Sequence, residues 1–280
     1  MEKYFLISMA LFVMIFTSCK KEDNSEDNQK LPVPVSYTKT SSSPLTFSFG
    51  QNSFMSLSGS IAKNTNTTTT TTVTYDKRII LKKTISNGTY NSEVNYYYKD
   101  AEKGILDSIV HISQGSFNGT IIYTTNNDDK YSKIEVLQTD RTIIAEHSYT
   151  YNGDKVSSYS WKEIFYGNAQ MDVSGNVNYT GDNVDNYILS GTFDGNPVTL
   201  SYQYTYDDKN YKSLNITTQE NAFRYTHNIT DLQVVMDYMG QQSIFQTTHN
   251  YTYNAENYPV TDERIDGNGT TNTAITYDDK

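Results

Sequence analysis

The sequence predicts an all-β fold, in which repeated hairpins form a large antiparallel up-and-down sheet that curls into a barrel-like or spiral structure. Three observations predict it: a composition rich in strand-forming residues, a tyrosine motif that recurs along the chain, and turn signals between alternating segments. The 280 residues include 25 Tyr, 11 Phe and 36 Thr, with six of the Thr in one run at 67–72. Aromatic and β-branched residues favour pleated strands over helices.

The tyrosine motif consists of an alternating Tyr-rich strand followed by Asn or Asp, as in residues 149–152, 204–207 and 251–254. Successive markers are 19 to 28 residues apart. Internal repeats of this length indicate one supersecondary unit used many times. The marker residues are Tyr75, Tyr98, Tyr123, Tyr151, Tyr179, Tyr206, Tyr225, Tyr253 and Tyr277.

Each repeat has the pattern of a β-hairpin. In residues 201–206 the side chains of Tyr202, Tyr204 and Tyr206 share one face of a strand, because successive residues point to opposite faces. The dipeptide Asn152-Gly153 favours a type I′ turn. A period near 25 residues fits two strands of about eight to ten residues with short connections. Eight such units predict roughly sixteen strands.

The expected sheet has an aromatic face and a Thr/Ser/Asn/Gln face. The aromatic face can be buried, while the polar face tolerates water. An open sheet of this size would expose two edges, so we expect it to curl into a barrel or spiral. A barrel of so many strands is too wide for its own side chains to fill, and we therefore expect a lumen or cavity.

The chain divides into three predicted parts. Residues 1–18 form a lipoprotein signal peptide, because the apolar run 4–16 suits a signal sequence and is too short to span a bilayer as a helix. Residues 19–45 carry the Cys and a flexible tether with Pro and Ser, and residues 46–280 form the hairpin repeat domain. The Thr-rich stretch 64–72 is expected to be an exposed strand end or a loop.

The end of the signal segment, Phe16-Thr17-Ser18-Cys19, resembles the lipobox of bacterial lipoproteins. The resemblance implies that Cys19 is diacylated, that the signal is cleaved before it, and that a further acyl chain such as palmitate is added to the new amine. Several acyl chains would anchor the protein firmly, whereas one chain binds a membrane only marginally. The alternative is an ordinary secretory signal that happens to be followed by a Cys.

The residues after the Cys also carry information about location. Lys21, Glu22 and Asp23 resemble the export signal of Bacteroidota lipoproteins, which implies the outer leaflet of the outer membrane, facing the medium. A charged run that merely solvates the tether is the alternative.

The repeats resemble two known groups. The Tyr-x-Tyr-Asn/Asp marker is similar to the YD repeat of Rhs-type shells. The lipobox together with Tyr-rich hairpins resembles uncharacterised Bacteroidota lipoproteins with a porin-like β-barrel fold, which implies a fold and a location but no activity. An integral outer-membrane barrel is disfavoured, because its outward bands would be Leu- and Val-rich rather than Thr- and Asn-rich.

Composition excludes several functions. Lys and Arg total 22 against 32 Asp and Glu, a net charge of −10. This balance argues against a nucleic-acid partner, because phosphate contacts need cationic side chains. A single Cys excludes a disulfide framework. No metal or cofactor is expected, since the four His residues are isolated and the Asp pairs fall at predicted turns. The four are His111, His147, His227 and His249.

Two local patterns are candidates for ligand or modification sites. Tyr159, Trp161 and Phe165 share one strand face with Glu163 between them, an arrangement that could stack a sugar ring, although a buried core strip is the favoured reading. Ser108, in Asp-Ser-Ile, resembles the acceptor of Bacteroidota O-glycosylation.

Taken together, the sequence predicts a lipid-anchored, surface-exposed envelope protein of the outer membrane. Its expected role is non-catalytic binding or structure, with a glycan or an envelope protein as partner. The alternative is an enzyme that acts on extracellular glycan polymers through a site in the lumen, assembled from scattered carboxylates and His.

Overall fold

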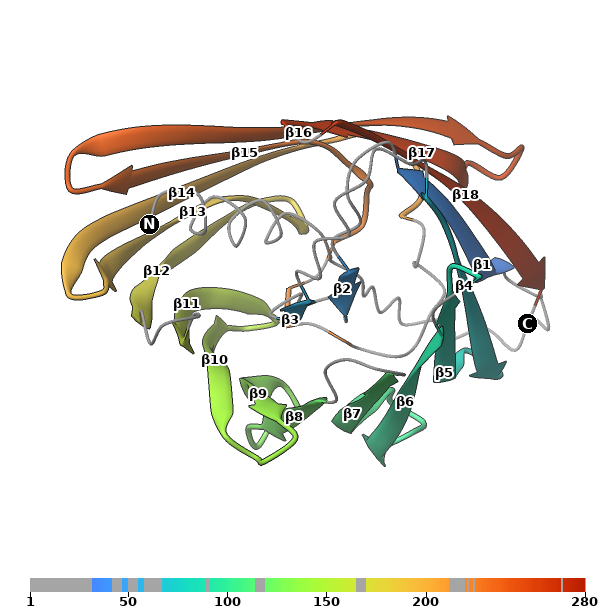
Figure 1. The fold of residues 1–280 in the computed structure, drawn as a ribbon, viewed down its shortest axis with the longest axis horizontal. Helices are drawn as coiled ribbons and strands as arrows, with labels where there is room; N and C mark the ends of the chain where they lie inside the picture. Colours follow the sequence, from blue (N-terminus) through green and yellow to red (C-terminus); the bar gives the residue numbers. More distant parts are fainter. Residues whose placement is uncertain are drawn as a thin grey trace.

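Sixteen strands of the computed structural model follow one another around a closed antiparallel barrel (Figure 1). The structure describes residues 32–41, 47–49, 55–57, 67–88, 91–113, 119–164, 170–211, 220, 222–223, 225–267 and 269–279. Within these ranges no helix is present, and the predicted all-β class and strand number are confirmed.

The barrel strands have the following bounds: β1 (Pro32–Ser41), β4 (Thr67–Asp76), β5 (Ile79–Ser86), β6 (Asn91–Asp100), β7 (Ile105–Ser113), β8 (Gly119–Thr125), β9 (Tyr131–Gln138), β10 (Ile143–Asn152), β11 (Lys155–Ile164), β12 (Gln170–Thr180), β13 (Asn183–Phe193), β14 (Asn196–Tyr206), β15 (Ile229–Tyr238), β16 (Gln241–Tyr253), β17 (Pro259–Asp266) and β18 (Gly269–Asp279). Two short strands, β2 (Phe47–Phe49) and β3 (Met55–Leu57), pair only with each other.

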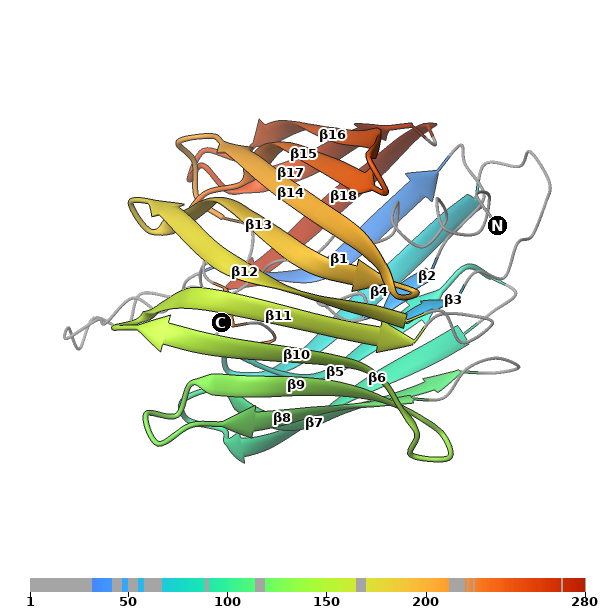
Figure 2. The same ribbon diagram turned by 90° about the vertical axis from the view of Figure 1, so that its left-hand side faces the viewer.

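Every barrel strand pairs with its neighbours along the chain, and β1 closes the ring by pairing with both β18 and β4. The strands cross the wall at a common tilt, which is clearest for β10 to β13 in Figure 2. Tilt of this kind accompanies the staggered register that lets a twisted sheet close. Closure removes the two edges that an open sheet would expose.

The predicted tether is wrong for residues 32–41, which form the closing strand β1. Val33, Val35 and Tyr37 alternate along it, and Val33 is fully buried. The prolines that suggested a linker are compatible with a strand here. Pro32 is the first strand residue, and Pro34 lies at a register shift, where a ladder hydrogen bond is not required.

Two further expectations differ from the structure. The Thr run is not a loop: residues 67–72 are the first part of β4, which pairs with β1 and β5 on its two sides, and residues 64–66 lie outside the described residues. Tyr225 does not mark a strand, but lies in the connection between β14 and β15. The short spacing of 19 residues from Tyr206 reflects this departure from the repeat.

The two faces of the wall divide as predicted. Along β12, Met171 and Val173 are buried toward the interior, while Asp172, Ser174 and Asn176 are exposed on the outside. The buried set is rich in Tyr, Val, Ile and Leu over most of the ring. The barrel therefore has an apolar, aromatic interior and an outer face dominated by hydroxyl, amide and charged side chains.

The structure explains why tyrosine recurs. At one end of the barrel, here named the turn end and marked by turns 77–78, 153–154 and 181–182, a Tyr hydroxyl of one strand donates to a main-chain carbonyl near the start of the preceding paired strand. Each of these hydrogen bonds joins two paired strands at a point beyond the last residues of their main-chain ladder. The bonds are Tyr75 to Pro34 (2.7 Å), Tyr98 to Ile80 (2.5 Å), Tyr151 to Tyr131 (2.8 Å), Tyr206 to Val184 (2.6 Å), Tyr251 to Ile229 (3.0 Å) and Tyr277 to Pro259 (2.9 Å).

Lysines connect successive turns at the same end. Lys130 donates to the carbonyl oxygen of Gly153 at 2.7 Å and pairs with Asp154 at 2.9 Å. Lys103 likewise pairs with Asp129 at 2.7 Å. The turn aspartates therefore bind lysines of the preceding hairpin, and exposed ion pairs of this kind each contribute about 0–1 kcal/mol.

Replacing Tyr151 with Phe is expected to lower the free energy of unfolding by about 1 kcal/mol, because the Tyr131 carbonyl loses its donor while the ring is retained. Urea unfolding of the two proteins measures the difference. Tyr97, which is 52% exposed on the outer face of β6, supplies the matched Tyr→Phe control and should change stability little. Equal effects at the two positions would contradict a specific role for the hydroxyl.

Candidate functional site in the barrel interior

Part of the connection between β14 and β15 lies in the barrel interior. Its described residues are 207–211, 220, 222–223 and 225–228, here called the interior segment. Glu220, Phe223 and Tyr225 are at most 3% exposed, and they contact side chains from strands on different sides of the ring. The lumen expected from the strand number is therefore occupied by the chain itself at these positions.

Phe223 sits in a cage of tyrosines from three strands, β10, β11 and β13. Its ring centre lies 5.8 Å from Tyr149, 5.6 Å from Tyr159 and 5.9 Å from Tyr187. The first two contacts are edge-to-face and the third is stacked. Aromatic pairs at these distances add to the energy of burial, so Phe223 holds the interior segment against β10, β11 and β13.

Glu220 binds the opposite wall. Its Oε1 lies 2.7 Å from Lys83 Nζ on β5, and the carboxylate is 1% exposed. Lys83 Nζ also lies 5.3 Å from the centre of the Tyr96 ring. Burial and the charge of Glu220 raise the pKa of Tyr96 well above its usual value. The Tyr123 hydroxyl donates to the Glu220 carbonyl at 3.3 Å, so β5, β6 and β8 all hold this one residue.

Two residues of the candidate stacking strip, Tyr159 and Trp161, are buried in the barrel interior. Tyr159 is covered by Phe223, and Trp161 is 2% exposed, so neither ring offers an open face to a sugar in this structure. Tyr159 Oη lies 2.6 Å from His147 Nδ1, and burial lowers the pKa of His147 well below its usual value. Phe165 lies outside the described residues. Tyr159 and Trp161 occupy core positions.

Glu163 accepts a hydrogen bond from Trp161 Nε1 at 2.9 Å, and burial raises its pKa from 4.5 to about 8. Between these values the folded protein holds a proton that the unfolded chain releases. The contribution of this proton to the free energy of unfolding is therefore complete below pH 4.5. It declines as the pH rises from there and is lost once the pH has passed 8.

Replacing Glu163 with Gln is expected to remove this pH dependence and to stabilise the protein at pH 9 by about 2 kcal/mol. Unfolding free energies at pH 5, 7 and 9 test it. Glu135→Gln, on the outer face of β9 where it pairs with Lys133, is the matched control. Parallel pH profiles for wild type and Glu163→Gln would contradict the assignment.

A second interior cluster lies on β16 and β17, where charged side chains replace the aromatic lining. His249 Nδ1 lies 2.7 Å from Asp262 Oδ1, with both side chains about a tenth exposed. Arg264 forms an ion pair with Asp266 on the same strand. The four groups form a polar wall of the interior, in which His249 lies beside Asp262 and Arg264 lies beside Asp266.

Sequence reasoning missed the polar wall and the interior segment. Alternation alone places His249 on the aromatic face, but pairing it with Asp262 requires the register between β16 and β17. The available signal was the alternation of Asp262, Arg264 and Asp266, three charged residues on one face of a strand. For the interior segment, the signal was the degenerate marker at Tyr225.

The other predicted site residues divide into two groups. Cys19, Lys21, Glu22 and Asp23 lie outside the described residues. Ser108 is on the outer face of β7, partly exposed, with its hydroxyl 3.3 Å from an Asp107 oxygen. Across the described ranges no group of three or more His, Cys, Asp or Glu could hold a metal ion.

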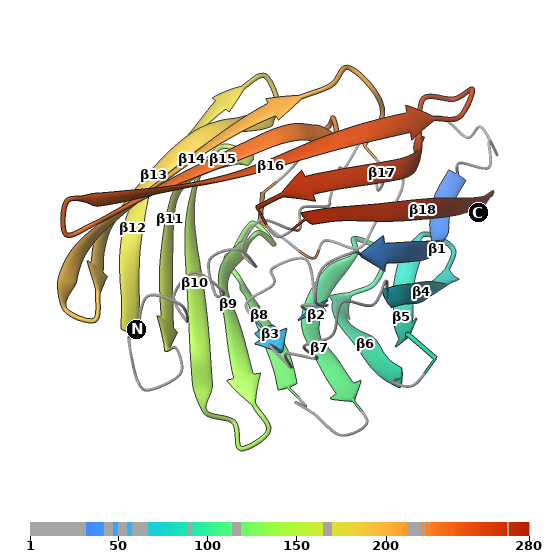
Figure 3. The ribbon, with the colours of Figure 1, turned by 45° about the horizontal axis from the view of Figure 1, so that its top comes forward.

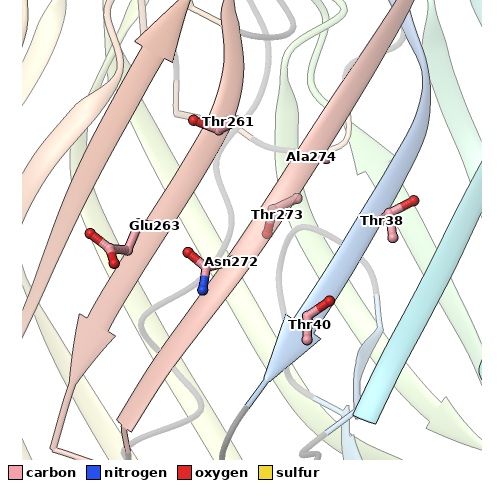
Figure 4. Close-up of a pocket in the computed structure, with 7 residues that line it drawn as sticks. All are labelled: Thr38, Thr40, Thr261, Glu263, Asn272, Thr273 and Ala274. Carbon is pink, nitrogen blue, oxygen red and sulfur yellow. The ribbon is translucent and has the colours of Figure 1, made fainter. Parts of the chain in front are cut away.

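The outer face carries a shallow hollow of about 290 Å³ across β1, β17 and β18 (Figure 4). Small side chains produce it, since Ala274 lies between Thr38 and Thr261 in the register. Glu263 is the one carboxylate in its lining, which comprises Thr38, Thr40, Thr261, Glu263, Asn272, Thr273 and Ala274. The hollow offers hydrogen-bonding groups to solvent without enclosing a ligand.

In the part of the chain that the structure describes, there is no helix with the length and hydropathy needed to cross a membrane.

Comparison with known proteins gives a likeness of fold alone. Neither a family model nor a curated protein sequence matches the chain. Among solved structures, a porin-like protein from Bacteroides uniformis ATCC 8492 superposes with a TM-score of 0.50 at 11% identity, covering 91% of this chain and 100% of that one. A porin-like protein from Bacteroides vulgatus ATCC 8482 gives a TM-score of 0.47 at 16% identity, covering 75% of this chain and 94% of that one. The chain shares the porin-like barrel fold.

Proposed function

We propose that this protein is a lipid-anchored barrel of the outer membrane, displayed to the medium, with a binding or structural role. The polarity of the outer face is the observation that carries the proposal. Along β12 the outward residues are Asp172, Ser174, Asn176 and Asn178, none of which suits hydrocarbon. A barrel with this surface belongs in water and needs a separate membrane anchor.

The N-terminal sequence supplies that anchor. The lipobox-like residues end at Cys19, and β1 begins only thirteen residues later, at Pro32. The intervening acidic run is only twelve residues long, which limits how far the barrel can lie from its anchor. Its resemblance to the Bacteroidota export signal supports the outer leaflet as the location, and the YD-like repeats and porin-like fold accord with a cell-envelope protein.

The filled interior supports a non-conducting role. Phe223 and Glu220 occupy the space that a pore would leave to water, and each is fixed by several wall residues. A partner such as a glycan or an envelope protein would therefore meet the outside or the rims of the barrel.

Lipidation is tested by labelling cells that express the full chain with an alkyne analogue of palmitate. We expect label on wild type and none on Cys19→Ser. Ser25→Ala, in the same tether, should label as wild type does. Label that persists on Cys19→Ser would overturn the anchor.

Surface display is tested by protease treatment of intact cells. Wild type should be digested, while Glu22→Ala/Asp23→Ala should be protected. The matched control is Glu26→Ala/Asp27→Ala, which removes the same charge from the same tether and should still be digested. Protection of wild type would defeat the proposed orientation.

The alternative of a glycan-acting enzyme has one structural observation in its favour, the His249–Asp262 pair on the polar wall. A panel of polymeric glycan substrates separates the two functions. The binding role predicts no turnover by wild type. Turnover that Asp262→Asn abolishes, without loss of folding, would establish the enzyme.

A further inference from the structure

One edge of strand β16 projects beyond the end of its neighbour β17. β17 ends at Asp266, which pairs with Thr247, so residues 241–246 of β16 have a strand neighbour only on the β15 side within the described ranges. Figure 3 shows the β15–β16 hairpin extending past the end of β17. This stretch lies at the end of the barrel opposite the turn end. A free edge presents main-chain N–H and C=O groups that another strand can pair with.

The side chains of this edge favour association. The sequence is Gln-Gln-Ser-Ile-Phe-Gln, without charge or proline, in a chain whose net charge is −10. Ile244, on the outer face at its middle, is 63% exposed. Natural edge strands are blunted by Lys, Pro or bulges, and none of these occurs in residues 241–246.

We propose that this edge is a strand-addition site for a second copy of the chain, with the two β16 edges paired antiparallel about a two-fold axis. Such a contact is isologous, so one surface serves both partners. A register centred on Ile244 places it opposite Ile244 of the second copy. It also sets Gln242 opposite Gln246 on the outer face, and Ser243 opposite Phe245 on the inner face.

This register is self-complementary. The outer face pairs apolar with apolar and amide with amide, contacts that stabilise neighbouring strands. Five residues on each edge, 242–246, provide about four to six main-chain hydrogen bonds. The uncharged stretch also lets two acidic chains approach, because it contributes no repulsion at the contact.

The two-fold symmetry also determines where the two lipid anchors lie, an inference that rests on the function proposed above. A two-fold axis perpendicular to the strands points the two barrels in opposite directions. Because β1 begins at the turn end and the free edge is at the other end, the two anchors would lie at the far ends of the dimer. The contact would then join copies on two facing membranes.

Sedimentation velocity of the purified full chain in mild detergent tests the dimer and does not depend on lipidation. We expect a concentration-dependent dimer that Ile244→Lys weakens at least about tenfold, since it places two cations opposite each other. Ile112→Lys, at a position 51% exposed on β7, is the matched control and should dimerise as wild type does.

A second measurement examines the register. Ile244→Cys should form a disulfide-linked dimer under mild oxidation, whereas Ile112→Cys, which carries the same natural Cys19, should not. If the chain stays monomeric at about 100 µM, the proposal is wrong. The strand that pairs with this edge would then come from a different protein. A dimer that Ile244→Lys does not weaken overturns the proposal as well.

Discussion

Replacing Lys83 with Met is expected to destabilise the barrel by about 3–5 kcal/mol, because it leaves the Glu220 carboxylate buried without its cation. Two charges in a low-dielectric interior offset each other's desolvation, and removing one exposes the full cost of the other. Guanidinium unfolding followed by the fluorescence of Trp161, the only tryptophan in the chain, measures the change.

The neighbouring residue provides the control. Lys82 pairs with Glu93 at the same 2.7 Å, but both side chains are more than a third exposed on the outer face. Lys82→Met should therefore cost less than about 1 kcal/mol. The double variant Lys83→Met/Glu220→Met, which removes both charges, should recover most of the lost stability. Similar losses for Lys82→Met and Lys83→Met would contradict an interior ion pair.

Truncating Phe223 to Ala is expected to cost about 3–5 kcal/mol, the usual range for a buried Phe. The cage of Tyr149, Tyr159 and Tyr187 would lose its central ring and keep a cavity, because the tyrosines are fixed in three separate strands. Phe223→Leu should cost less, since it fills most of the space.

The matched control for this series is Tyr97→Ala, an exposed aromatic truncation on β6 that should change stability by less than about 0.5 kcal/mol. Unfolding midpoints and slopes are compared for all three variants. A loss for Phe223→Ala no larger than that of Tyr97→Ala would mean that the interior segment does not pack against the wall.

Much of the fold could be predicted because the pattern that specifies it is local. Alternation assigns each side chain to a face, and the Tyr motif places turns at a regular interval, so the barrel and its two faces follow from the sequence. Two errors change the predicted strand number in opposite directions. Tyr225 was counted within the strand repeats, and β1 was assigned to the tether.

The candidate site was less predictable because it depends on contacts between distant residues. Lys83 and Glu220 are 137 positions apart, and no local pattern relates them. Trp161 could be placed on the inner face, but only the position of Phe223 shows that Tyr159 beside it is covered. The same holds for His249, whose partner is set by strand register. Alternation specifies which face a residue occupies, and the tertiary structure specifies what covers that face.

Phase partition of the chain beginning at Lys20 tests most directly the claim that the barrel belongs in water and is held to the membrane by lipid alone. This chain retains every barrel strand, including the closing pair β1 and β18. When a detergent solution is warmed until it separates, the chain should enter the aqueous phase, while the lipidated full chain should enter the detergent phase. A chain from Lys20 that enters the detergent phase would show a lipid-facing barrel and contradict the account.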